Sequence, residues 1–342
     1  MSQVKDDLSL MELMIEDGKK AESLYRPTHY WARFQDELVN ELRTDGLEDF
    51  RNRKKSIMVR FGGVDIDPMH EFLYDTNDLI LKPFQIITKI KLGINKFLRK
   101  TDQQMERYTI ARNYGIKNNA KPIENLSTTK LGNPSEIFEV KGKLYNSLIL
   151  NKYIEYAYCC KFINFDNINT IVELGPGGGK QVEVIKRLHP HICFYLFDIA
   201  PEQYVCEQYL SALFPNDVVS YRETREMQDL PTPEKGKIFI IGNWKISQLK
   251  NLKFDLFWNS GSLDETEYEV AQNYLSYPNT QAKYVYLKMS SKGVRHTVHP
   301  VKLDDCKNFL TNFKLVDKSV CILVPKILPF MSYRFAFWEK TK

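Results

Sequence analysis

The sequence predicts an α/β protein whose core is a mostly parallel sheet, preceded by a mainly helical region. From residue 170 onward, short apolar runs alternate with segments of helical periodicity, as in a sheet whose parallel strands are joined by helices. The first run ends in a glycine-rich loop that leads into an amphipathic stretch, the arrangement with which α/β folds bind nucleotide-like ligands. Over residues 1–140, apolar residues instead recur at three- and four-residue steps, the spacing of helices.

The glycine-rich loop indicates which ligand this fold would hold. It follows the pattern acidic-x-Gly-x-Gly-x-Gly, with Glu173, Gly175, Gly177 and Gly179 at the defined positions. A dinucleotide fingerprint would need a glycine where Lys180 stands, and a phosphate-binding P-loop would need Ser or Thr after that lysine, where glutamine stands. An acidic residue here also repels a pyrophosphate and attracts a cationic ligand.

This loop resembles the first motif of class I S-adenosylmethionine-dependent methyltransferases. The resemblance implies a Rossmann-like class I methyltransferase fold, with a mostly parallel sheet and a C-terminal antiparallel strand pair. It also implies S-adenosyl-L-methionine as the cofactor, bound by Glu173, Gly175, Gly177 and Gly179. The alternative is that the glycines form only a tight turn.

The later strands supply further candidates for cofactor binding. Asp198 lies 25 positions beyond Glu173, close to the offset at which α/β nucleotide folds place an acid against the ribose hydroxyls. The alternative for Asp198 is the N-cap of the next helix. Asn243 and Trp244 follow the third strand, where adenine is expected, and Asn259 ends the fourth. We predict strands at 170–172, 192–197, 237–242, 254–259 and 283–289, helices over 181–188, from 201 and over 265–276, and a final strand pair at 320–324 and 333–338.

We expect residues 1–140 to form a mainly helical region on the acceptor side and residues 141–342 to form the methyltransferase domain. Residues 113–143 are rich in Asn, Lys, Gly and Pro, which predicts a connection. The helical pattern that returns over 145–162 would lead into the first strand.

The segment 25–31 (YRPTHYW) has two interpretations. In the first, it is a helix cap followed by a hydrophobic anchor. In the second, His29, Tyr30 and Trp31 line an acceptor pocket, because aromatic faces suit the apolar sides of sugars.

The stretch 79–100 is apolar on one side, basic on the other and free of acidic residues. It predicts a helix packed on the core with a solvated lysine face; the alternative is a helix lying on an anionic membrane surface.

Composition and charge limit the partners. The net charge of +5, from 48 basic and 43 acidic residues, is too small and too dispersed to indicate nucleic-acid binding. The N-terminus has no signal-like apolar segment, and no run is long enough to cross a membrane. The six cysteines form no C-x-x-C pair and indicate reduced core residues rather than a zinc site. We therefore expect a cytoplasmic protein; its oligomeric state stays open.

Four short motifs carry a narrower resemblance. In chain order they are RPTHYW at 26–31, LGNP at 131–134, ELGPGGG at 173–179 and FDLFWNSGSLDE at 254–265. Together they resemble a family of sugar O-methyltransferases from bacterial surface-polysaccharide gene clusters. The family's segment after the fourth strand is Asn-x-x-Ser-Phe-x-Glu-Met, from which Leu263 and Thr266 depart. The resemblance implies methyl transfer to a sugar hydroxyl.

Such a transfer needs a base close to the acceptor hydroxyl, because a sugar hydroxyl is a weak acid. The candidates are Glu265, after the fourth strand, and His296 and His299, after the fifth. Each has a simpler alternative, a helix-capping role for Glu265 and a packing or solvated role for the histidines. No dense cluster of ligands supports a metal, and Asp264 with His296 is the pair to check.

Three functions compete on this evidence. The first is a sugar O-methyltransferase, acting on a nucleotide-sugar, a lipid-linked sugar or a polymeric glycan. The second is a methyltransferase for another small-molecule, protein or nucleic-acid acceptor, although the amino-methylating subclass is disfavoured by Asn259–Ser262 (NSGS). The third is a non-catalytic partner protein that binds the cofactor.

Overall fold

The computed structural model describes residues 4–27, 29–52, 104–134, 136–291, 293, 298–321 and 333–341. The stretch 79–100, the side chains of His29 and Tyr30, and His296 lie outside the described part of the chain.

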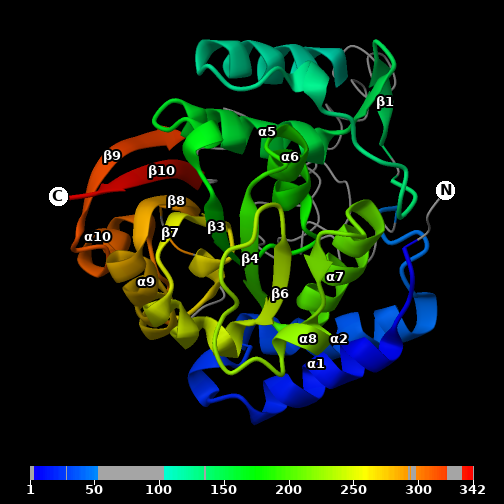
Figure 1. The fold of residues 1–342 in the computed structure, drawn as a ribbon, viewed down its shortest axis with the longest axis vertical. Helices are drawn as coiled ribbons and strands as arrows, with labels where there is room; N and C mark the ends of the chain where they lie inside the picture. The colour runs from blue at the N-terminus through cyan, green and yellow to red at the C-terminus, as the bar shows by residue number, and fades with distance from the viewer. Residues whose placement is uncertain are drawn as a thin grey trace, which may run out of the picture.

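The core is an eight-stranded sheet in the order β5-β6-β4-β3-β7-β8-β10-β9 (Figure 1). Neighbouring strands from β5 to β8 run parallel, whereas β10 pairs antiparallel with both β8 and β9. The fold is Rossmann-like, as the sequence predicts. The strands are β3 (Thr170–Leu174), β4 (Cys193–Asp198), β5 (Val218–Val219), β6 (Ile238–Gly242), β7 (Phe254–Ser260), β8 (Ala282–Ser290), β9 (Phe313–Val320) and β10 (Tyr333–Lys340), beside a separate hairpin of β1 (Phe138–Val140) and β2 (Lys143–Tyr145).

Helices cover both faces of the sheet, because the central strands are apolar on both sides. Alternate residues of each strand enter two hydrophobic clusters, so that Ile171 faces one side of β3 and Val172 the other. The first cluster is shared with α1 (Leu8–Lys20), α2 (His29–Asp45), α5 (Ser147–Cys160), α6 (Lys180–Leu188) and α7 (Ala200–Leu213). The second is shared with the 3₁₀ segment η5 (Asn243–Asn251), α9 (Tyr268–Gln281) and α10 (Cys306–Phe309).

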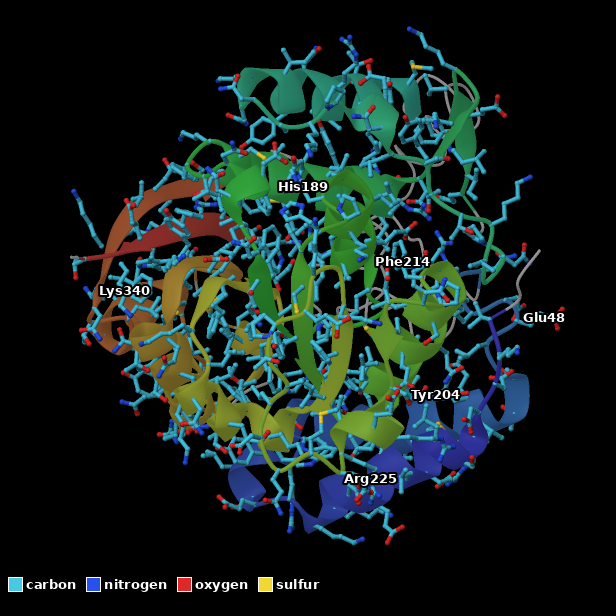
Figure 2. The ribbon with its side chains drawn as sticks, in the orientation of Figure 1. Glu48, His189, Tyr204, Phe214, Arg225 and Lys340 are labelled. Carbon is cyan, nitrogen blue, oxygen red and sulfur yellow. The ribbon has the colours of Figure 1, made fainter. Side chains whose placement is uncertain are left out.

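The N-terminal helices are attached to the sheet domain by polar contacts as well as by the shared core. The Arg225 guanidinium, just after the short helix α8 (Tyr221–Thr224), donates to Asp17 of α1 over 2.8 Å, and the Asp7 N–H donates to the Tyr204 hydroxyl over 2.9 Å. Figure 2 shows Tyr204 and Arg225 on the side of the molecule along which α1 runs. The domain boundary near residue 140 stays a prediction.

Two expectations about secondary structure were wrong. The strand that pairs with β10 lies at Phe313–Val320 and overlaps the expected strand at 320–324 only at Val320, because the pairing selects a polar edge segment. Cys321 is outside this strand, and residues 322–324 lie outside the described part of the chain. The expected connection at 113–143 begins as a helix, since residues 104–117 are helical in the described part of the chain. Within the described ranges, no helix combines the length and apolarity needed to cross a bilayer.

Candidate functional site

The glycine loop joins β3 to α6 at the carboxyl edge of the sheet. Gly175, Gly177 and Gly179 all have positive φ angles, of +69°, +51° and +72°, which side-chain-bearing residues rarely adopt. The Gly175 N–H donates to the Phe197 carbonyl over 2.8 Å, and the Gly177 N–H donates to the Asp198 carboxyl over 3.1 Å. The loop is therefore held against the end of the neighbouring strand β4.

The segment after β7 closes on the same loop. A Cβ on Gly175 would lie 2.2 Å from the Ser262 hydroxyl oxygen, so only glycine fits this contact. The Asn259 amide donates to the Leu174 carbonyl over 2.8 Å and also to Ser262, while its oxygen accepts from the Leu263 N–H. Asn259 thus ties the end of β7 and the residues that follow it to the glycine loop. Its hydrogen bonds go to other groups of the protein.

Three buried carboxyl groups surround the loop. Burial is the main cause that raises the pKa of Glu173 to about 8 and the pKa of Asp198 to about 7. Glu202, in the first turn of α7, has a strongly raised pKa through burial and the neighbouring Asp198. Asp198 accepts from Gly177 and from the Ile199 N–H, whereas one oxygen of Glu202 is buried without a hydrogen-bond partner among the described residues.

The direction in which Glu202 points follows from the next turns of α7. Cys206 and Leu210 of this helix lie beside Gly179, at 3.2 and 3.0 Å from the position of a Cβ on that glycine. Glu202 is one turn before Cys206 on the same face. The loop is therefore bordered by buried acidic groups, with the charge of Lys152 acting on Glu173 only enough to offset part of the effect of burial, which suits a cationic ligand.

A cavity of about 450 Å³ adjoins the ends of β4 and β6. One wall consists of the residues that follow these strands, and the other comes from the N-terminal helices and the turn that joins them. The two walls are Ile199, Ala200, Asn243 and Trp244 on the sheet side, and Ile15, Gly18, Lys19, Tyr25, Arg26, Pro27, Gln35, Asp36, Val39, Asn40 and Arg43 on the other.

Asn243 and Trp244 give this cavity a polar and an aromatic element. The Asn243 amide donates to the Tyr25 carbonyl over 2.7 Å and to the Tyr274 hydroxyl over 2.8 Å. Its side-chain oxygen is buried and has no hydrogen-bond partner within the described part of the chain. Trp244 is half-buried beside Gly18 of α1.

The three catalytic candidates have different environments. Glu265 ends the 3₁₀ turn η6 (Leu263–Glu265), which begins directly after Ser262 and so lies next to the glycine loop. His299 is exposed, and its main chain is held by Glu267, which accepts from the His299 N–H over 2.7 Å. His296 is outside the described residues, so its pairing with Asp264 is not placed.

Asp264 itself is fully buried and accepts from the Ser290 N–H over 2.8 Å, which indicates a role in holding the turn. Across the described ranges, no group of three or more His, Cys, Asp or Glu residues could hold a metal.

Sequence reasoning missed Glu202 and Tyr274. A signal for Glu202 was available, because it lies only four residues after Asp198, at the start of the helix expected to follow that strand. Tyr274 meets Asn243 only because α9 packs on η5, and sequence spacing does not reveal that contact.

No family model matches the sequence, and no curated protein matches it either. Among solved structures, the chain is similar to the mitomycin 7-O-methyltransferase MmcR (10% identity, TM-score 0.35, 56% of this chain and 57% of that one). It is similar to the pyocyanin biosynthetic protein PhzM (12% identity, TM-score 0.37, 55% and 57%). It is also similar to the magnesium protoporphyrin IX methyltransferase ChlM from Synechocystis PCC 6803 with bound SAM (13% identity, TM-score 0.39, 69% and 97%).

The match spans 57% of the length of MmcR and of PhzM. At these identities and TM-scores, the likenesses carry no argument about the cofactor or the acceptor of this protein.

Proposed function

We propose that this protein is an S-adenosyl-L-methionine-dependent O-methyltransferase that acts on a sugar hydroxyl in bacterial surface-polysaccharide biosynthesis. The observation that carries the proposal is the left-handed glycine loop at the carboxyl edge of a parallel sheet, bordered by the buried carboxyl groups of Glu173, Asp198 and Glu202. Buried carboxyl groups without a positive partner are costly, and a cationic ligand offsets that cost. A pyrophosphate-bearing cofactor would add negative charge at the same place.

The residues present fit this cofactor. When bound, S-adenosyl-L-methionine supplies an electrophilic methyl group on a sulfonium, which an acceptor oxygen can attack. Glu173 and the glycine loop would hold the cationic methionine part, and Asp198 would accept from the ribose hydroxyls. The unpartnered oxygen of Asn243 would accept from the adenine amino group, with Trp244 packing against the ring.

The affinity for S-adenosyl-L-methionine is expected to rise about tenfold between pH 6 and pH 8. A cation binds the ionised carboxylate, and Asp198 and Glu173 ionise around pH 7 and pH 8 in the free protein. Binding near neutral pH should therefore release protons, which calorimetry in buffers of different ionisation enthalpy measures. An affinity that stays flat or falls over this range, or tighter binding of NAD or a nucleoside triphosphate, would contradict the proposed cofactor.

The sugar acceptor rests on the four ordered motifs, and their positions in the fold support it. Arg26 and Pro27 of the first motif line the cavity. The glycine loop contacts Ser262 of the motif at 254–265, which contains β7, and Gly132 of the LGNP motif packs on Phe50. Phe50 lies 5.5 Å from the amino group of Lys180, the first residue of α6. Segments far apart in sequence thus meet around one end of the sheet.

Glu265 is our candidate for the base that takes the proton of the acceptor hydroxyl. Glu265→Gln should lower kcat by about 100-fold, the usual contribution of a general base, and leave the affinity for the cofactor within about twofold of wild type. Steady-state kinetics with labelled cofactor measures the first, and calorimetry measures the second. Glu269→Gln, on the exposed side of α9, is the control and should leave both unchanged. A Glu265→Gln enzyme with normal kcat would transfer the role to His299 or His296.

Methyl transfer from labelled S-adenosyl-L-methionine separates the proposed function from its two alternatives. Incorporation into nucleotide-sugars, lipid-linked sugars or glycan supports it. Incorporation only into other small molecules or protein would favour a different acceptor, and cofactor binding without transfer to any of them would favour a non-catalytic partner.

A further inference from the structure

The first helix, α1, contacts the residue that is proposed to pack against adenine. A Cβ built on Gly18 would lie 3.3 Å from Cζ3 and 3.7 Å from Cη2 of the Trp244 indole. Gly18 is a residue of α1 and does not have a positive φ angle, so its conformation does not itself require glycine. Glycine disfavours a helix relative to alanine, and the close approach of the Trp244 ring to the α1 backbone gives a packing reason for it.

Two further contacts fix the Trp244 ring. A Cβ on Gly242, the last residue of β6, would overlap Cζ2 of the indole, so the ring lies directly on the backbone of this glycine. The Tyr221 ring of α8 packs edge-on against the indole, with the ring centroids 6.1 Å apart and an angle of 81° between the planes. Tyr221 is 1% exposed. The position of Trp244 therefore depends on α1 and α8 as well as on its own strand.

Asp17, the neighbour of Gly18, holds the same part of α1 against α8 (Figure 1). The Tyr221 hydroxyl donates to the Asp17 carboxylate over 2.8 Å. The Arg225 guanidinium donates to both oxygens of Asp17, over 2.8 and 3.2 Å. The hydrogen bond from Arg225 is the largest cause that lowers the pKa of Asp17, which is therefore ionised at neutral pH.

Lys245, the residue after Trp244, completes the connection. Its amino group donates to three main-chain carbonyls at the end of α8 and just after it, among them that of Arg225, each over 2.7 Å. The carbonyl of Arg225 is thus bound to Lys245 and its guanidinium to Asp17. Trp244 is consequently connected to α1 in two ways, directly through Gly18 and indirectly through these three residues.

We propose that Gly18 and Arg225 are positioning residues for the cofactor, because they set where the Trp244 ring lies in the adenine part of the cavity. The helix α1 is thereby part of the cofactor site, whereas the sequence predicts its region on the acceptor side. The inference rests on the proposed function and concerns the same cavity, which Gly18 and Trp244 both line. Packing between an aromatic ring and a base depends on their separation and offset, so a displaced Trp244 binds adenine less tightly.

The test is the binding of S-adenosylhomocysteine to single and double variants of the protein, measured by calorimetry. Trp244→Ala removes the stacking surface and should weaken binding about tenfold. Gly18→Ala introduces a Cβ too close to the indole, which must shift, and should weaken binding about fivefold. Arg225→Gln releases Asp17 and should weaken binding about threefold.

The double variants decide whether Gly18 and Arg225 act through Trp244. In the Trp244→Ala background there is no ring to displace. Gly18→Ala and Arg225→Gln should each then change the affinity by less than about 1.5-fold. A general loss of folding or of cavity shape would instead weaken binding to the same extent in both backgrounds, and that result overturns the proposal.

Arg222→Gln is the matched control for Arg225→Gln. Arg222 also joins α8 to the first helix, but its guanidinium pairs with Asp7, at the opposite end of α1, over 3.1 Å. Its replacement should leave the affinity for S-adenosylhomocysteine within about 1.5-fold of wild type. Equal losses in the two variants would mean that the attachment of α1 as a whole, and not the position of Trp244, controls binding.

Steady-state kinetics supply a second measurement. Adenine contacts act equally on the bound cofactor and on the transition state, so Gly18→Ala should raise KM for S-adenosyl-L-methionine about fivefold and leave kcat unchanged. A partly unfolded variant would lower kcat instead. Wild-type protein that binds no S-adenosylhomocysteine would refute the proposed function and this inference with it. Wild-type binding that neither Trp244→Ala nor Gly18→Ala weakens would leave the proposed cofactor in place and overturn the role of α1.

Discussion

Replacing Glu173 by glutamine is expected to weaken S-adenosyl-L-methionine binding about 100-fold, or about 2.7 kcal/mol. Glu173 is 2% exposed, and its carboxyl group forms no hydrogen bond within the described part of the chain. In the proposed function its ionised form attracts the cationic cofactor, and an amide of the same shape cannot supply the charge. The variant should also lose most of the rise in affinity between pH 6 and pH 8. Calorimetry at both pH values measures both effects.

The same substitution should stabilise the ligand-free protein at high pH. Burial raises the pKa of Glu173 in the folded state to about 8, above the ordinary value of 4.5 in the unfolded chain. Its contribution to stability is therefore fully present below about pH 4.5 and is lost as the pH rises through 8. Relative to wild type, Glu173→Gln should gain about 2 kcal/mol at pH 9 and little at pH 5. Urea unfolding at the two pH values measures the difference, and equal gains at both would contradict it.

Asp255→Asn is the matched control for Glu173→Gln. Asp255 is also a buried carboxylate, but it lies at the opposite end of the sheet and is paired. It accepts from the main-chain N–H groups of Asn169 and Thr170 and from the amino group of Lys283. Its replacement should lower stability and leave cofactor affinity unchanged, the reverse of both effects at Glu173.

Replacing Gly175 by alanine is expected to destabilise the fold by about 2–4 kcal/mol and to abolish measurable cofactor binding. The new Cβ would lie 2.2 Å from the Ser262 oxygen and 2.5 Å from the Ser262 Cβ, so no rotation of the serine relieves the overlap. The positive φ of +69° adds backbone strain of about 1–2 kcal/mol. Urea unfolding and calorimetry measure the two losses.

Two variants separate the overlap from the backbone strain. Gly142→Ala has a similar φ of +77° with nothing within 4 Å of the new Cβ, so it should cost about 1 kcal/mol and leave binding intact. In the double variant Gly175→Ala/Ser262→Gly, the overlap is removed and the backbone strain remains, so about half of the lost stability should return. If stability did not recover, the contact of Gly175 with Ser262, after β7, would not be the reason that this position needs glycine.

The glycine loop and the strands around it could be predicted from sequence because their signals are local. A β-branched run followed by glycines at alternating positions identifies a strand, a turn with positive φ angles and the start of a helix within ten residues. Strands buried on both faces are also recognisable, since β4, β6 and β7 are nearly continuous apolar runs. The edge strand β9 lacks this signal, because most of its residues are exposed, and it was misplaced.

The sequence by itself determined the fold class, the position of the loop and the order of the strands that carry Asp198, Asn243 and Asn259. Only the tertiary structure decided what these residues contact. It turned the amide of Asn259 inward to the protein and placed Glu202 beside Asp198. It also left an oxygen of Asn243 without a hydrogen-bond partner among the described residues. The physical reason is that secondary structure follows from neighbours along the chain, whereas burial, charge pairing and pKa depend on segments that meet only when the sheet is assembled.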